Sequence, residues 1–168
     1  DAELLSVLVN FFGSVGLTKD DLVIKISSRK VLEEVLGSLG IEGDEFSKTC
    51  VIVDKMDKHP ADVIEAQLAD LGIASSSIST IQKVLGISDM EELEKALGAD
   101  SPSLSELASL FTLIDSYGIG GWVEFDASVV RGLAYYTGPV FEAHDRAGVF
   151  RAICGGGRYD RLIGTLGG

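Results

Sequence analysis

Long apolar runs and cysteines are both scarce in this sequence, and each scarcity restricts the class of protein. No stretch approaches the roughly 20 consecutive apolar residues that span a membrane, so we expect no membrane partner. The two cysteines, Cys50 and Cys154, have neither a metal-ligand spacing nor the pattern of a disulfide framework. We therefore predict a reducing compartment and no protein-bound metal. The start also lacks a methionine and a basic signal region, so we expect that an earlier segment is missing or was removed.

Positive charge is scarce as well, and it is unevenly placed. The formal net charge is −12. Residues 31–120 hold 5 basic and 17 acidic side chains, whereas the two flanks together hold 9 of each. Because an acidic surface repels phosphate, we do not expect the middle segment to bind nucleic acid non-specifically.

The first 30 residues predict a helix and a strand. In DAELLSVLVNFFGSVGL, apolar residues recur at the spacing of one helix face. We expect that buried face to hold Leu4, Leu8, Phe11 or Phe12, and Val15. The segment LVIKIS at 22–27 alternates apolar and polar residues, as a half-buried strand does.

Residues 31–120 have helical periodicity and predict a small helical domain. Pro60 can open a helix that ends before Gly72. Two Ser and Glu pairs have the spacing of capping boxes, in which side chains satisfy the free amides of a helix's first turn. These pairs are Ser88 with Glu91 and Ser103 with Glu106.

Residues 121–168 change to short alternating segments that predict strands, namely WVEF, VFEAHD and VFRAIC. The last two are joined by a turn at 145–148 that ends in Gly148, so we expect an antiparallel hairpin. A glycine-rich stretch, GGGRYDRL, follows it. The stretch lacks the lysine of a P-loop and the third glycine of a dinucleotide fold. Its glycines can serve a phosphate or let the backbone pass close to another ligand.

A second cluster lies at 129–142, VVRGLAYYTGPVFE. Arg131 and Tyr136 would point to opposite faces of a straight strand, so a shared site requires a bend, which Gly132 can supply. The residues alone also fit a packed strand with a surface arginine.

Together, RGLAYYTGPVFE and AICGGGRYDRL resemble the paired signature segments of histidine-tRNA ligases, which are class II aminoacyl-tRNA synthetases, and of their close paralogues. The preceding segments resemble the family's helix and strand after the second class-defining motif, followed by its helical insertion. The resemblance therefore covers essentially the whole chain. It implies an α+β fold, a fragment of the antiparallel-sheet catalytic domain with a helical insertion. The implied division is 1–30 and 121–168 for the catalytic part and 31–120 for the insertion.

The resemblance also implies a reaction and a set of site residues. The full-length parent would use ATP with magnesium to form histidyl-adenylate and would transfer histidine to tRNA(His). Arg131 matches the arginine that faces the α-phosphate, where a fixed guanidinium can stabilise developing charge. The matches to the histidine pocket are Tyr136, Tyr159, Gly155, Gly156 and Gly157, and the matches to supporting positions are Tyr135, Arg158 and Asp160.

Departures from the family pattern limit what the resemblance implies. Ala134 stands where many relatives carry aspartate, although some organelle-type relatives tolerate alanine. For the compartment we expect the cytoplasm, with an organelle (plastid or mitochondrion) as the alternative. The first motif with its dimer interface, the second- and third-motif arginines and the anticodon-binding domain have no counterpart in these residues. We expect a homodimeric parent and an inactive fragment. The alternatives are a regulatory paralogue of histidine biosynthesis, against which Arg131 argues, and a non-catalytic interaction fragment.

The charge count generates a first testable prediction. Residues 31–120 expressed alone should bind tRNA weakly or not at all near physiological salt, because each phosphate contact contributes only about −0.7 to −0.9 to the logarithmic salt slope and few cations are available. Tight binding with a steep salt slope, measured by filter binding across a salt series, would show instead that the five lysines gather on one face.

Overall fold

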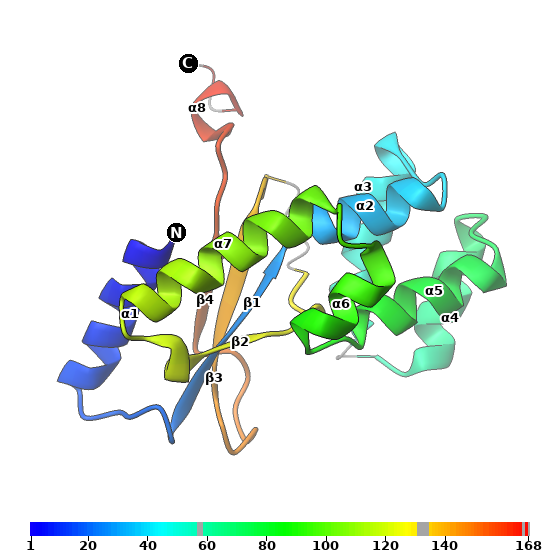
Figure 1. Cartoon of the computed structure of the whole chain (residues 1–168). Coiled ribbons are helices and arrows are strands. Elements are labelled where there is room, and N and C mark those ends of the chain that lie inside the picture. Colours follow the sequence, from blue (N-terminus) through cyan, green and yellow to red (C-terminus); the bar gives the residue numbers. More distant parts are fainter. Residues whose placement is uncertain (57–58, 131–134, 166, 168) are drawn as a thin grey trace.

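The computed structural model describes residues 1–56, 59–130, 135–165 and 167. These residues form a four-stranded sheet in the order β2-β1-β3-β4 with helices packed around it (Figure 1). Strand β1 (Leu22–Ser28) pairs antiparallel with β3 (Pro139–Asp145) along the full length of both. Strand β2 (Val123–Phe125) is parallel to β1, and β4 (Cys154–Gly157) is antiparallel to β3. The predicted α+β class is confirmed, with one parallel pair in the sheet.

The helices follow the periodicity of the sequence. Among the described residues, helix α1 precedes the sheet, six α-helices lie between β1 and β2, and a short helix comes last. Their bounds are α1 (Ala2–Ser14), α2 (Arg29–Ser38), α3 (Gly43–Val53), α4 (Ala61–Asp70), α5 (Ser75–Leu85), α6 (Met90–Leu97), α7 (Pro102–Ser116) and α8 (Leu162–Thr165), with a 3-10 turn η2 (Gly120–Trp122) before β2. Among the described residues, no helix is both long and apolar enough to cross a bilayer.

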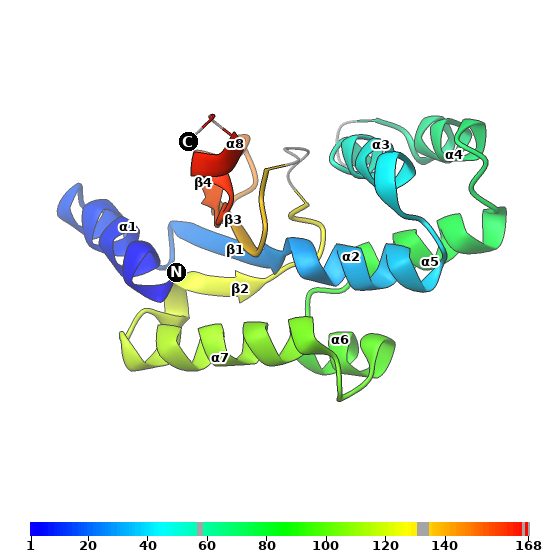
Figure 2. The same cartoon turned by 90° about the horizontal axis from the view of Figure 1, so that it is seen from above.

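Two large hydrophobic cores hold most of these elements together, and a small third cluster contains Val129, Tyr136 and Val140. The first packs α1, α6 and α7 against one face of the sheet, and Ile24, Leu107 and Ile114 are fully buried in it. The second lies among α2, α3, α4 and α5, with Leu36 and Leu68 at its centre. Seen from above, α7 runs alongside β2 while α3 and α4 lie beyond the end of β1 (Figure 2). Helix α7, the last helix of the middle segment, thus packs on the sheet. The division into domains at residues 30 and 120 stays a prediction.

Helix α1 confirms the expected helix, but of the residues expected on its buried face only Phe12 is buried. Leu4, Phe11 and Val15 are more than half exposed, and Leu8 is partly buried. The buried residues are Ala2, Leu5, Val9 and Phe12. Both sets recur at three- and four-residue spacing. Because α1 is apolar on two sides, its period does not decide which side packs; contact with α7 does.

The predicted hairpin is confirmed, but its second strand is displaced along the chain. Strand β4 consists of Cys154 and the three glycines, not of residues 149–154. The Asp145 carboxylate accepts hydrogen bonds from the amides of Val149 and Phe150 at 2.9 and 3.0 Å, which takes these amides out of the ladder. Gly148 adopts a φ of 66° within this turn, as its residue type allowed.

Both predicted capping boxes are wrong in detail. Asp89 caps α6, with its carboxylate accepting from the amides of Glu91 and Glu92. Ser101 caps α7, which begins with a proline. The predicted helices themselves are present; each cap lies one or two residues from its expected position.

The α1 correction generates a matched pair of substitutions. Leu5→Ala removes a side chain that is 2% exposed and should lower the free energy of unfolding by about 2–5 kcal/mol. Leu4→Ala, at a position 58% exposed, should change it by less than about 0.5 kcal/mol. Urea unfolding measures both. Equal losses, or a larger loss at Leu4, would contradict the observed face of α1.

The Lys25–Asp126 pair ties the loop after β2 to the sheet and predicts an acid-sensitive stability. Lys25 Nζ lies 2.7 Å from Asp126 Oδ2. Burial raises the pKa of Asp126, but hydrogen bonds from Lys25 and Ser128 lower this pKa by more than burial raises it. The pKa of Asp126 therefore lies below its ordinary value. The stabilisation is therefore present above the unfolded pKa of about 3.9 and is lost as the pH falls through the folded value.

Asp126→Asn should accordingly cost about 1 kcal/mol at pH 6, and the difference from wild type should disappear at pH values below the folded pKa. Urea midpoints at both pH values provide the measurement. A constant difference across this range would show that the loss is steric and not due to charge.

Candidate functional site

Three tyrosines from the two predicted motifs meet beside the end of β4. Tyr135 and Tyr136 have ring centroids 4.9 Å apart, and Tyr159 lies 5.8 and 6.0 Å from them. Tyr136 is buried, whereas Tyr135 and Tyr159 are 45% and 42% exposed. The structure therefore brings residues 23 positions apart in the sequence into one aromatic cluster with a closed inner side and an accessible outer side.

The glycines of β4 allow this approach. Gly157 pairs with Val140 across the ladder, and a Cβ at position 157 would lie only 2.7 Å from the ring of Tyr136. A Cβ at Gly156 would lie 3.0 Å from the ring of Phe141 on the opposite face. Both rings pack directly on bare backbone. Gly156 and Gly157 therefore serve close packing of side chains against the strand, and the glycines lie within β4 instead of following the hairpin.

An open cleft of about 730 Å³ adjoins the cluster. All the predicted histidine-pocket residues line it. Apolar side chains of α1 and α7 form part of its wall, and the other lining residues include the supporting positions and a carboxylate at the start of the chain. The residues named for this site by sequence and found in the cleft are Tyr135, Tyr136, Gly155, Gly156, Gly157, Arg158, Tyr159 and Asp160.

Hydrogen bonds between backbones fix the segment that carries Tyr159. The Arg158 amide donates to the Pro139 carbonyl at 2.9 Å, and the Thr137 amide donates to the Arg158 carbonyl at 2.8 Å. The Thr137 hydroxyl donates to the Asp160 carboxylate at 2.8 Å and accepts from the Asp160 amide at 3.0 Å. The two motifs are thus joined on both sides of Arg158, and Asp160 has the loop-fixing contacts expected of a supporting residue.

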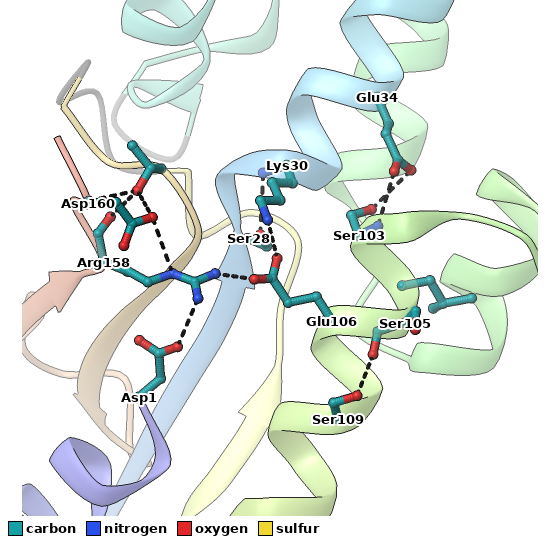
Figure 3. Close-up of polar contacts among 12 residues, drawn as sticks. Asp1, Ser28, Lys30, Glu34, Ser103, Ser105, Glu106, Ser109, Arg158 and Asp160 are labelled. Carbon is teal, nitrogen blue, oxygen red and sulfur yellow. Dashed lines mark hydrogen bonds and ion pairs between the residues drawn. The ribbon is translucent and has the colours of Figure 1, made fainter.

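The Arg158 guanidinium lies at the centre of a charged network (Figure 3). It donates to the Glu106 carboxylate of α7 through a short contact, and it lies 3.5 Å from Asp1 and 3.9 Å from Asp160. Lys30 Nζ lies 2.9 Å from the other Glu106 oxygen. Burial raises the pKa of Glu106, but the hydrogen bond from Arg158 and the nearby ammonium of Lys30 lower it by more, so the carboxyl pKa lies below its ordinary value. Glu106 is therefore ionised at neutral pH.

Two of these charged residues were not singled out from the sequence as parts of a site. Asp1 gave no pattern at all, because a single acidic residue before a helix is ordinary. Glu106 was assigned to a capping box on its spacing from Ser103. Only the position of α7 in the folded chain reveals that the carboxylate faces Arg158, the residue after β4.

Arg131, the predicted catalytic residue, lies outside the described residues, as does Ala134. Its assignment stays a prediction. No described group of three or more His, Cys, Asp and Glu side chains is arranged to hold a metal. Burial also raises the pKa of the Cys50 thiol to about 11, which keeps it protonated and unsuited to ligation.

A second hollow of about 810 Å³ lies near β2. Its volume is similar to that of the aromatic cleft, so size does not decide between the two as candidate sites. Its lining includes the Lys25–Asp126 ion pair and the apolar side chains of Met56 and Phe111, but none of the predicted site residues. Because Lys25 and Asp126 already satisfy each other, they offer little to a ligand. The aromatic cleft is therefore the better candidate site.

Comparisons with known proteins agree with the motifs. The family model described as histidyl-tRNA synthetase matches residues 1–168. The chain is 48% identical over 168 residues to the chloroplastic/mitochondrial histidine-tRNA ligase of Arabidopsis thaliana, covering 100% of this chain and 35% of the relative. It is 33% identical to the histidine-tRNA ligase of Cytophaga hutchinsonii, covering 99% of this chain and 38% of the relative.

Solved structures share the fold. Histidyl-tRNA synthetase from Nostoc superposes with a TM-score of 0.85 at 28% identity, covering 99% of this chain and 41% of that one. The chain thus spans roughly two fifths or less of the length of these proteins. The whole-chain match to the family model and the coincidence of both motifs with the cleft lead to one conclusion: the chain belongs to the histidyl-tRNA synthetase family.

Proposed function

We propose that the full-length protein containing this chain is a histidine-tRNA ligase and that this chain contributes its histidine pocket. The observation that carries the proposal is the meeting of Tyr136 and Tyr159, from separate motifs, beside the bare backbone of Gly157. Phenol hydroxyls can donate to or accept from imidazole nitrogens. A site built to pair with such nitrogens rejects amino acids that leave its polar groups unpaired.

The proposed division of labour separates binding from chemistry. Tyr136 and Tyr159 select histidine, the backbone of 155–157 forms the wall of the pocket, and Tyr135 supports the ring cluster. Arg131 faces the α-phosphate of ATP and stabilises the charge that develops when the histidine carboxylate attacks the α-phosphorus and pyrophosphate leaves. The full-length protein would use ATP with magnesium and tRNA(His) as substrates, and it would act as a homodimer.

The same proposal extends to the compartment. The names of the relatives include a chloroplastic/mitochondrial form in Arabidopsis thaliana and a cytoplasmic form in Dictyostelium discoideum. We propose the cytoplasm, with an organelle as the alternative.

Histidine-dependent exchange of pyrophosphate into ATP tests the proposal. The full-length protein should catalyse it, and this chain alone should not. Arg131→Ala should slow adenylate formation by about 10²- to 10³-fold while changing histidine affinity little. Tyr136→Phe and Tyr159→Phe should mainly raise the KM for histidine.

Two outcomes would contradict these assignments. A full-length protein that binds histidine without exchanging pyrophosphate would be a regulatory paralogue. One kinetic profile shared by all three variants would show that the separation of binding from chemistry is wrong.

A further inference from the structure

Glu106 lies on α7, outside both signature motifs, yet it makes the closest contact to the motif residue Arg158. Because Ser101 supplies the cap of α7, the Glu106 side chain is not used at the helix start. It extends from α7 toward Arg158, the residue after β4; one oxygen receives the Arg158 guanidinium and the other faces Lys30 at the start of α2 (Figure 3). A single carboxylate therefore joins three separate parts of the chain.

Arg158 directly precedes Tyr159, so its anchoring bears on the tyrosine. Its backbone is hydrogen-bonded on both sides to the 137–139 segment. Its guanidinium also occupies the space that a Cβ at Gly138 would take. The position of this side chain is thus coupled to the backbone that connects Tyr136 to β3.

We propose that Glu106 is a positioning residue for the histidine pocket. It holds the Arg158 guanidinium toward α7 and thereby sets the position of Tyr159 relative to Tyr136. This inference rests on the proposed function, since the pocket is the one assigned to histidine above.

The neighbouring carboxylates explain why the loss of Glu106 would move the loop. Asp1 and Asp160 lie 3.5 and 3.9 Å from the guanidinium, on other sides of it than Glu106 (Figure 3). Without Glu106, Arg158 can re-pair with either of them. The charge of Arg158 stays neutralised and Lys30, whose side chain is 43% exposed, turns to solvent, so folding is largely preserved, but the guanidinium turns away from α7. An adjustment of this kind displaces Tyr159 without unfolding the chain.

Glu34 provides a matched control on the same pair of helices. Its carboxylate accepts from the Ser101 hydroxyl at 2.5 Å and from the Ser103 amide and hydroxyl at 3.1 and 3.0 Å, so it also joins α2 to α7. It has no described contact with Arg158. If attachment of α7 were all that mattered, substitutions at Glu34 and Glu106 would act alike.

The experiment compares Glu106→Gln and Glu34→Gln in the full-length protein by histidine-dependent pyrophosphate exchange. Glu106→Gln should raise the KM for histidine about tenfold, the loss expected for a charge-assisted hydrogen bond. Its kcat and its KM for ATP should stay within about threefold of wild type. Glu34→Gln should lower the thermal midpoint and leave the KM for histidine unchanged. Arg158→Ala and the Glu106→Gln/Arg158→Ala double variant should show the same KM, because both act through one contact.

The inference is overturned if Glu106→Gln matches wild type, if it matches the Glu34→Gln profile, or if the double variant is additive. Should Glu106→Gln not fold, Glu106→Asp, which keeps the charge but withdraws it by one methylene, is measured against the same three outcomes. Failure of the proposed function is recognised separately, because wild type itself would then show no histidine-dependent exchange.

Discussion

The full-length pairing of β1 with β3 is the constraint on which the rest of the structure depends. Its register aligns Ile24 with Ala143 and Ile26 with Phe141, so these residues share the face that packs under α1 and α7. Successive residues of a strand point to opposite faces, and a slip of one residue would exchange the two faces completely. Strand β4 is placed by β3 in turn. The position of Gly157 beside Tyr136 therefore follows from a register set by the hydrophobic side of the sheet.

Side-chain charges connect this sheet to the helices. The helical segment 31–120 is strongly acidic. Its residue Glu106 pairs with two cations, Lys30 and Arg158, that both lie outside this segment in the sequence. Glu34 serves a different purpose, because its partners are neutral groups at the start of α7. Some of the acidic residues in the middle of the chain therefore have defined structural partners. The net charge of the segment alone does not show which of its carboxylates face solvent.

Much of the fold follows from the sequence, because periodicity reports the type of an element well. The helices, β1, β3 and the hairpin were predictable from these patterns, whereas the gathering of Tyr136 and Tyr159 at one site was implied only by the family resemblance. The side on which α1 packs was not, since apolar residues lie on both of its sides. The start of β4 depends on Asp145 capturing two amides, an event no pattern reports. Glu106 could not be found because its partner lies 52 positions away.

The most direct measurement is a structure of the full-length protein with histidine bound. The imidazole should lie within about 3 Å of the Tyr136 and Tyr159 hydroxyls, beside the backbone of 155–157. Arg158 should still contact Glu106. Histidine bound elsewhere, or bound in this cleft with both hydroxyls beyond hydrogen-bond reach, would contradict the assignment of the pocket.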